Sequence, residues 1–321
     1  FANVVLAIIV FVSIGVFFGF PDSARPQNRV GMVTPQSEAA RMDLRAGDRV
    51  LEINGSRITD GRQMINAVHK SPGREVTMLI RRNNETLTRT GTPRWHIEYL
   101  GTSWSFTDEG VGKAAEIREN SQAQNAGIAE GDKLLSIDGR SVRSGSDMAE
   151  ILDSLDGRKA AIELDRNGEI IKTEAAADIS WVRYLGEQWF VSNSSVYLSP
   201  RGLEPDSKAV GLGFKYGDEL DTINGTPIKS GRDMITALEK SGSGDIAFGI
   251  VRDEKNINIT IPAAAAAGET PEAAYYSAFG LLGFVPEPRL EKAGLTESIG
   301  QGLQSVWRLG ELILSVITSD R

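Results

Sequence analysis

Hydrophobic and polar positions follow the same order three times along the chain. The third copy shows that order most simply: a short amphipathic stretch at 207–212, alternation at 219–223, a helical apolar face at 234–238, and alternating stretches at 245–251 and 256–261. Alternation with a period of two predicts a strand, whereas apolar residues at i, i+1 and i+4 predict a helix. Each copy is therefore expected to contain two short helices and several strands.

Turn residues keep the three copies in register. A Gly-Asp pair begins seven positions before an Asn-Gly or Asp-Gly pair in every copy: Gly47-Asp48 with Asn54-Gly55, Gly131-Asp132 with Asp138-Gly139, and Gly217-Asp218 with Asn224-Gly225. Because glycine tolerates positive φ, we expect the first glycine of each set to occupy a left-handed turn. The second pair predicts a type I′ hairpin turn. Repeats of roughly 70 residues can bury separate cores, so we expect three independently folding domains rather than a stacked solenoid.

The two ends of the chain differ from the repeats. Residues 1–20 carry no charge, and about 20 apolar residues suffice for a membrane-spanning helix. A secretory signal peptide is the rival interpretation, but its basic start and cleavage site are not visible. Residues 298–321 are amphipathic, with an apolar run at 312–317. They are interpreted as the start of a second membrane helix, an interfacial helix or a soluble helix packed on a neighbour.

Composition excludes several functions. The formal net charge is −8, and no basic run is present that could follow a phosphate backbone, so we expect no nucleic-acid partner. Cysteine is absent, which removes disulfides and cysteine metal sites. The two histidines, His69 and His96, belong to no metal or catalytic motif. We therefore expect no catalytic residue, no metal site and no cofactor within this chain.

The order of elements together with the Gly-Asp…Asn-Gly signature resembles a PDZ domain of the bacterial type. The resemblance implies an α+β fold with three tandem PDZ-like small β-barrels of two helices each, flanked by an N-terminal transmembrane helix and the start of a C-terminal membrane helix. The expected division is a transmembrane helix at 1–20, PDZ-like domains at 29–92, 110–178 and 194–262, a linker at 263–297, and a membrane or amphipathic helix at 298–321.

PDZ domains bind an extended peptide as an added strand between a sheet edge and the second helix. Carried over by position, the resemblance assigns peptide-binding roles to strand and helix residues in each copy: Val30, Met32, Met64 and Val68; Ala115, Ile117, Met148 and Leu152; Val196, Leu198, Met234 and Leu238. Ordinary core packing is the alternative for each of these apolar residues. The related segments Tyr99-Leu100-Gly101, Tyr184-Leu185-Gly186 and Leu281-Leu282-Gly283 are expected to be connecting strands that start the next unit.

The whole arrangement is similar to the middle of the RseP-type site-2 proteases, which are intramembrane zinc metalloproteases. The similarity extends to Asn3 and Ala7 at one end and to 286–288 and 306–309 at the other. Members of that branch carry one or two PDZ units, whereas three are counted here. The resemblance implies a zinc metalloendopeptidase whose zinc ligands and catalytic glutamate lie outside this chain, so the chain alone should be inactive.

For the intact protein, the same resemblance implies a bacterial inner-membrane location with the PDZ domains on the periplasmic side. Its expected partners are membrane lipid and protein or peptide substrates, such as membrane proteins with exposed C-termini, and the PDZ domains would screen or bind them during regulated intramembrane proteolysis. The alternative is a non-catalytic membrane-anchored scaffold, or a secretion or chaperone component, built from PDZ domains.

Overall fold

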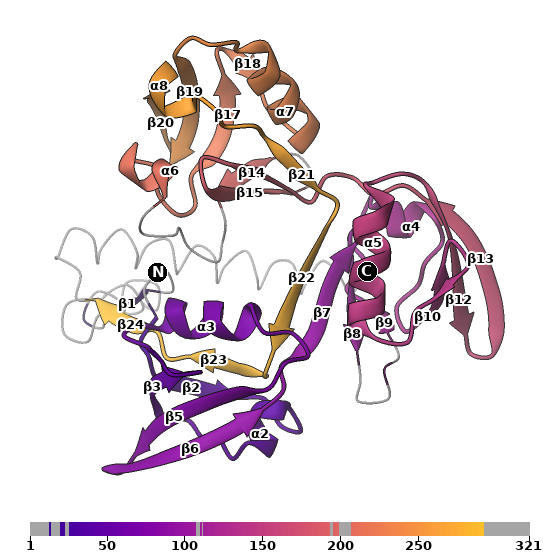
Figure 1. The fold of residues 1–321 in the computed structure, drawn as a ribbon, viewed down its shortest axis with the longest axis vertical. Coiled ribbons are helices and arrows are strands. Elements are labelled where there is room, and N and C mark those ends of the chain that lie inside the picture. The colour runs from indigo at the N-terminus through magenta and orange to yellow at the C-terminus, as the bar shows by residue number, and fades with distance from the viewer. Residues whose placement is uncertain are drawn as a thin grey trace, which may run out of the picture.

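The repeats build three hydrophobic cores, one for each copy. The computed structural model describes residues 13, 20–22, 26–106, 110, 112–192, 195–198 and 207–291 (Figure 1). Almost all of the predicted membrane segment at 1–20, and all of 298–321, lie outside these residues. Within the described part of the chain, no helix has both the length and the apolar character needed to cross a membrane.

The second copy, called unit 2, is continuous in sequence. Its elements are β7 (Arg94–Tyr99), β8 (Thr102–Phe106), β9 (Gly112–Ala115), α4 (Gln122–Asn125), β10 (Lys133–Ile137), β11 (Arg140–Ser141), α5 (Gly145–Leu155), β12 (Ala160–Arg166) and β13 (Glu169–Ala175). The sheet order is β13-β12-β10-β9-β8-β7, and β11 pairs with β10. The apolar face of α5, including Met148 and Leu152, packs on Trp104 and Ile162 in the core.

The third copy, called unit 3, repeats this order. Its elements are β14 (Trp181–Tyr184), β15 (Glu187–Val191), β16 (Val196–Leu198), α6 (Lys208–Gly211), β17 (Glu219–Ile223), β18 (Thr226–Pro227), α7 (Gly231–Lys240), β19 (Ile246–Arg252), β20 (Lys255–Ile261) and α8 (Ala263–Ala266). The predicted strand at 219–223 and the helix through Met234 are present. The hydroxyl of Ser230 accepts a hydrogen bond from the Asp233 N–H and caps α7, as N-cap serines commonly do.

The first copy, called unit 1, is split in sequence. Its first part holds β2 (Val30–Val33), α2 (Glu38–Arg41), β3 (Arg49–Ile53), β4 (Ser56–Arg57), α3 (Gly61–His69), β5 (Val76–Arg82) and β6 (Glu85–Gly91). Its remaining strands, β22 (Tyr276–Leu281) and β23 (Phe284–Pro286), come from beyond unit 3. Leu282 lies in the unit 1 core and is only 2% exposed. Unit 1 is therefore not the independent domain expected at 29–92, because part of its core lies about 200 residues downstream in the sequence.

One backbone hydrogen bond shows that the three units are equivalent. The Ala39 N–H donates to the Leu282 carbonyl at 2.7 Å in unit 1. The same bond joins Ala123 to Leu100 at 2.8 Å in unit 2 and Ala209 to Leu185 at 3.3 Å in unit 3. Leu281-Leu282-Gly283 therefore completes unit 1 instead of starting a further unit. The other two Leu-Gly segments do join the first two strands of units 2 and 3.

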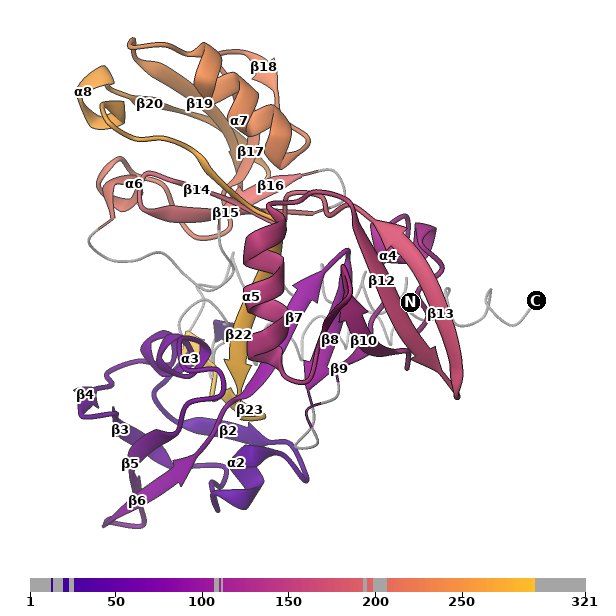
Figure 2. The same ribbon diagram turned by 45° about the vertical axis from the view of Figure 1, so that its right-hand side comes forward.

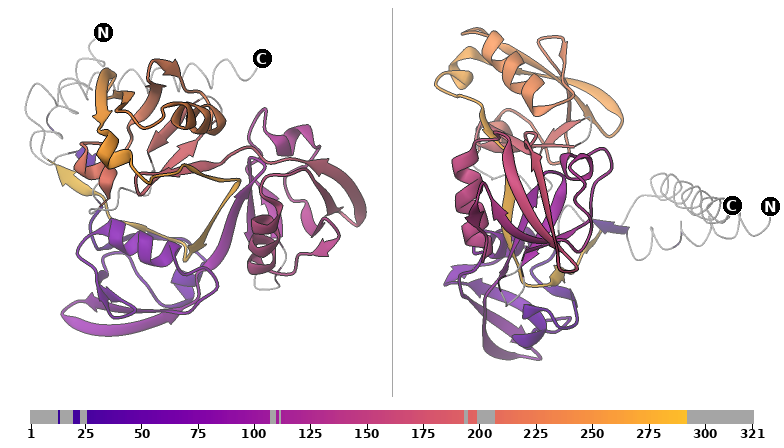
Figure 3. Two further views of the ribbon diagram at one scale, coloured as in Figure 1. Left: turned by 45° about the horizontal axis from the view of Figure 1, so that its top comes forward. Right: turned by 90° about the vertical axis from the view of Figure 1, so that its right-hand side faces the viewer.

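Part of the segment expected to be a linker at 263–297 forms strands that pair with all three units. We call residues 272–291 the strap; it comprises β21 (Glu272–Ala274), β22, β23 and β24 (Arg289–Glu291). β21 pairs with β14 of unit 3, β22 with β7 of unit 2, and β23 with β2 of unit 1. β24 pairs with β1 (Phe20–Asp22). Figures 2 and 3 show the strap passing between the units, so it ties them together through backbone hydrogen bonds.

The turn residues adopt the conformations that their sequence predicts. Gly47, Gly131 and Gly217 have φ of +91°, +89° and +80°. Both residues of each Asn-Gly or Asp-Gly pair also have positive φ, for example +48° at Asn224 and +76° at Gly225. Positive φ at both central residues defines the type I′ turn, which matches the twist of a tight hairpin. The prediction of left-handed glycines is thus confirmed in all three copies.

Candidate functional site

A buried Asp–Arg ion pair organises the Gly-Asp turn of every unit. These aspartates are at most 1% exposed. The Nε–Oδ1 distances are 2.7 Å for Asp48–Arg82, 2.7 Å for Asp132–Arg166 and 2.6 Å for Asp218–Arg252. The other carboxylate oxygen accepts the backbone N–H of Arg45, Ala129 or Lys215, each at 2.8 Å. The pattern analysis missed the arginines, although an arginine follows each aspartate by 34 positions.

This ion pair holds the turn to the β-hairpin at the end of the unit and leaves no reactive group free. Burial raises the pKa of the Asp132 carboxyl. Hydrogen bonds from Arg166 and from the Ala129 N–H, together with the charge of Arg166, outweigh burial and hold that pKa below its ordinary value. The charged form of the aspartate is therefore part of the folded state, and its role is structural.

The strands assigned to peptide binding from the sequence have neighbours on both sides. β9 lies between β8 and β10, and β16 lies between β15 and β17. β2 pairs with β23, while the Val30 N–H on its other side donates to the Asp48 carbonyl at 2.8 Å. A peptide cannot add to a strand whose backbone groups are already paired. The edges proposed from the sequence are therefore not open in the structure.

Most of the assigned side chains belong to the cores. Nine of the twelve are buried: Val30, Met64, Val68, Met148, Leu152, Val196, Leu198, Met234 and Leu238. Ala115 and Ile117 are half-buried, and Met32 is 58% exposed. The core-packing alternative therefore describes nine of these positions in this structure.

PDZ domains bind an added peptide strand between a sheet edge and the second helix. In unit 2, the chain itself fills this position beside α5. β7 pairs with β8 on one side and with β22 on the other, and it packs against α5. Ile97 and Tyr99 of β7 are 0% and 3% exposed. At the start of α5, Gly145 lies so close to Trp95 that a Cβ would overlap the indole. β7 thus occupies the position that an added peptide strand would take.

Unit 3 has the same arrangement. β14 lies between β15 and β21 and packs against α7. Val182 and Tyr184 of β14 are 0% and 3% exposed, like their counterparts in unit 2. Strand addition beside β15 would require β14 to leave.

Unit 1 differs because its first two strands separate. β22 pairs with β7 of unit 2 and not with β23. In the described part of the chain, β23 pairs with β2 alone. α3 packs against both β22 and β23. Gly280 of β22 lies so close to the Val68 carbonyl that a Cβ would overlap it, and a Cβ on Gly61 would overlap Pro26. A cavity of about 440 Å³ lies at the start of α3, lined by Pro26, Gln27, Asn28, Thr59, Asp60, Arg62 and Arg289. Among the described residues, β23 keeps one edge without a strand partner.

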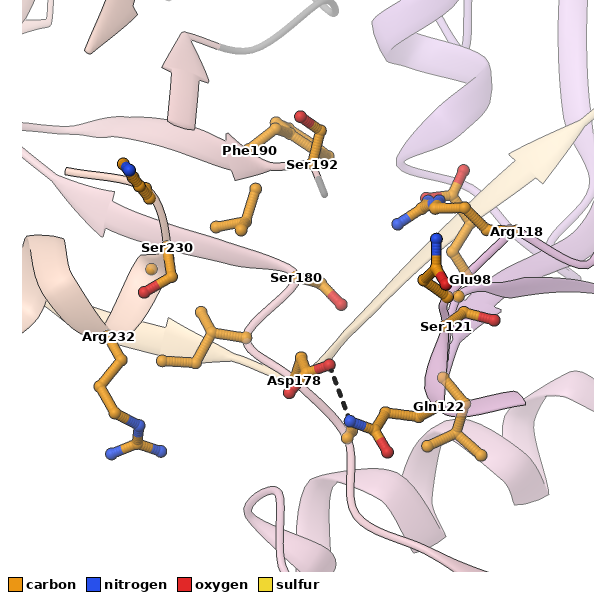
Figure 4. A pocket seen from close by; sticks show the side chains of 18 of the residues that line it. Glu98, Arg118, Ser121, Gln122, Asp178, Ser180, Phe190, Ser192, Ser230 and Arg232 are labelled. Carbon is orange, nitrogen blue, oxygen red and sulfur yellow. Dashed lines mark hydrogen bonds between the residues drawn. The ribbon is translucent and has the colours of Figure 1, made fainter. Parts of the chain in front are cut away.

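A second cavity, of about 810 Å³, lies between units 2 and 3 (Figure 4). Glu98, Arg118 and Ser121 of unit 2 line one side, and Phe190, Ser230 and Arg232 of unit 3 line the other. The Gln122 amide donates to Asp178 at 3.1 Å beneath it. The walls combine both signs of charge with the aromatic rings of Phe190 and Tyr197, and the volume is within the range of small-ligand sites. The lining contains no histidine or cysteine that could act as a base or nucleophile.

The two histidines, far apart in sequence, meet at the strap. The rings of His69 and His96 lie 4.9 and 4.7 Å from the ring of Phe279 in β22, centroid to centroid. Among the residues that the structure describes, no three metal-ligating side chains are grouped closely enough to hold an ion. The histidines therefore contribute to packing where units 1 and 2 meet the strap.

Comparison with known proteins agrees with this geometry. The sequence profile of the PDZ domain matches residues 29–82 and 114–166. The chain is 34% identical over 92 residues to the zinc metalloprotease RasP of Geobacillus kaustophilus, and 30% identical over 91 residues to the regulator of sigma-W protease RasP of Bacillus subtilis. Units 1 and 2 therefore each contain a segment that matches the PDZ domain. Unit 3, which the profile does not match, shares their element order, left-handed glycine and buried Asp–Arg pair.

The matched relatives are longer proteins. The alignments cover 29% of this chain and 21% of the Geobacillus protein, and 28% of this chain and 21% of the Bacillus protein. A putative zinc metalloprotease of Neisseria meningitidis is 26% identical over 179 residues, which is 52% of this chain and 38% of that protein. Among solved structures, the HtrA-type protease AlgW with a decapeptide aligns with a TM-score of 0.23 at 15% identity, covering 39% of this chain and 41% of AlgW.

Proposed function

We propose that this chain is the substrate-screening PDZ region of an intramembrane zinc metalloprotease on the periplasmic side of the bacterial inner membrane. The observation that carries the proposal is the pairing of β1 with β24, in which Phe20 lies opposite Glu291. This pairing places the end of the uncharged segment 1–20 beside Glu291, which lies seven positions before the amphipathic segment 298–321. All three units thus form one insertion between two proposed membrane segments.

The zinc chemistry of such an enzyme would lie outside this chain. A zinc ion in a protease lowers the pKa of its bound water and polarises the peptide carbonyl. The described residues do not fit a zinc site, since no three ligating side chains are grouped. The role left to this chain is recognition, so the domains would select which membrane proteins reach the catalytic residues.

Peptide recognition belongs, in this proposal, to unit 1. A strand of a protein substrate would add beside β23 and contact the outward face of α3, where Ile65 is half-buried while its neighbours Met64 and Val68 are in the core. Backbone hydrogen bonds supply the affinity in this kind of recognition, and side-chain pockets supply the specificity. Units 2 and 3 would support unit 1 through the strap, because their corresponding positions hold β7 and β14.

An NMR titration of the full chain with hydrophobic C-terminal peptides tests the peptide site. Ile65→Glu should weaken binding, because a charge would then have to be desolvated against the peptide. Ile170→Glu is the matched control, since Ile170 is 53% exposed on β13 of unit 2. Equal binding by both variants and the parent chain would exclude the α3 side of unit 1 as the site.

The enzyme assignment is tested on the intact gene product. Membranes containing it should cleave a membrane-spanning substrate and lose that activity with a chelator, whereas this chain alone should cleave nothing. A gene product without a zinc-binding motif upstream would instead support the scaffold alternative.

A further inference from the structure

Exposed apolar side chains gather at one place in the described part of the molecule. Two of its seven exposed large hydrophobic residues lie on the paired strands β2 and β23, and a third lies on β24, the next strand of the strap: Met32 is 58% exposed, Val285 is 51% exposed and Leu290 is 55% exposed. Met32 and Val285 are cross-strand partners. Both line a hollow of about 630 Å³ together with Pro286, Pro288 and the Arg29–Glu287 ion pair. We call Met32, Val285 and Leu290 the apolar patch.

Unit 2 does not share the patch. Val30 and Ala114 are equivalent, since each donates its N–H to the aspartate of its Gly-Asp turn at 2.8 and 2.9 Å. Two positions further on, Met32 therefore corresponds to Glu116, which is exposed in unit 2. Counted from the shared Leu-Gly turns, Val285 of unit 1 corresponds to Ser103 of unit 2 and Gln188 of unit 3. Met32 and Val285 are thus apolar and exposed in unit 1, where unit 2 has Glu116 and Ser103.

The patch lies beside the point where the uncharged segment joins the fold. Phe20 is both the last residue of that segment and the first residue of β1. Leu290 is the cross-strand partner of Pro21. Val285 precedes Leu290 by five positions, so the two residues lie at most about 17 Å apart. If the uncharged segment spans the bilayer, the patch must lie near its surface.

We propose that the apolar patch rests on the lipid bilayer and orients unit 1 on the membrane. This inference rests on the proposed function, which supplies the membrane. Insertion of these side chains into the headgroup region would remove exposed apolar area from water, which is the driving force for interfacial binding. It would also fix the direction in which the open edge of β23 faces the membrane and thus the approach of a substrate.

The chain contains no cysteine, so each introduced cysteine provides a single site for a spin label. The full chain is reconstituted in phosphatidylethanolamine–phosphatidylglycerol vesicles with single labels at Met32→Cys, Val285→Cys and Leu290→Cys. Ile170→Cys is the exposed control in unit 2, and Ile9→Cys reports on the uncharged segment. Each label is measured for collision with oxygen, which concentrates in lipid, and with a water-soluble nickel chelate.

We expect the three patch labels to collide several-fold less often with the nickel chelate than the Ile170 label, and more often with oxygen. Patch labels that match Ile170 while the Ile9 label is in lipid would overturn the bilayer contact and leave the tether intact. An Ile9 label that is open to the chelate would overturn the membrane tether itself, and the patch proposal with it. Patch labels protected from both reagents would show that protein, not lipid, covers the patch, which also overturns the proposal.

Discussion

The left-handed glycine of the Gly-Asp turn gives a sharp test of how the repeat is built. Gly217 has φ +80°, and a Cβ added to it would meet no atom within 4 Å. Gly217→Ala therefore creates no clash, and its cost is conformational. An L-residue in the left-handed region costs about 1–2 kcal/mol. The reduced entropy of the unfolded chain returns about 0.4–1 kcal/mol, so unit 3 should lose about 1 kcal/mol of unfolding free energy.

Gly211 supplies a matched control six residues away. It ends α6, also has no atom within 4 Å of an added Cβ, and lacks the positive φ. Alanine in a helix is favoured over glycine by about 0.5–1 kcal/mol. Gly211→Ala should therefore stabilise the same unit that Gly217→Ala destabilises, although both changes add one methyl group in open space.

Hydrogen exchange of the full chain, followed by mass spectrometry of peptides from β17 and β19, measures both variants. A loss of about 1 kcal/mol corresponds to roughly fivefold faster exchange where exchange requires opening of the unit. Peptides from unit 2 serve as the internal reference and should not change. Equal shifts in the same direction for both variants would refute the conformational argument and indicate that the methyl group acts through contacts.

Two further predictions concern the ion pairs and the strap. Because the folded-state pKa of Asp132 is lowered, its contribution to stability should be fully present above pH 3.8, its ordinary pKa, and lost as the pH falls through the folded value. Asp132→Asn should cost unit 2 about 1–3 kcal/mol at pH 7 and flatten this acid dependence in urea titrations; an unchanged pH profile would contradict the role given to Arg166. A chain ending at residue 268 should lose exchange protection in unit 1 while unit 3 keeps its own, and a chain ending at 291 should regain it. Protected β3 and β5 in the shorter chain would show that Leu282 is dispensable.

Local signals in the sequence were sufficient for the repeat itself. The Gly-Asp and Asn-Gly pairs specify backbone conformations that few other residues adopt, so their spacing predicts the turns, the hairpins and the number of units. The apolar face of Met234 and Leu238 predicts α7 because a helical period is visible within a few residues. These features depend only on neighbours in the chain.

The tertiary structure alone decided which strands meet. The strand at 276–281 has the same short apolar pattern whether it links two domains or completes one, and its partner His96 lies 183 positions before Phe279. Backbone pairing over such a separation leaves no period in the sequence, because any strand offers the same N–H and C=O groups. For that reason the sequence predicted three domains and a linker. In the fold, unit 1 is split, and β7 and β14 fill the grooves of units 2 and 3. Among the described residues, one edge of β23 has no strand partner.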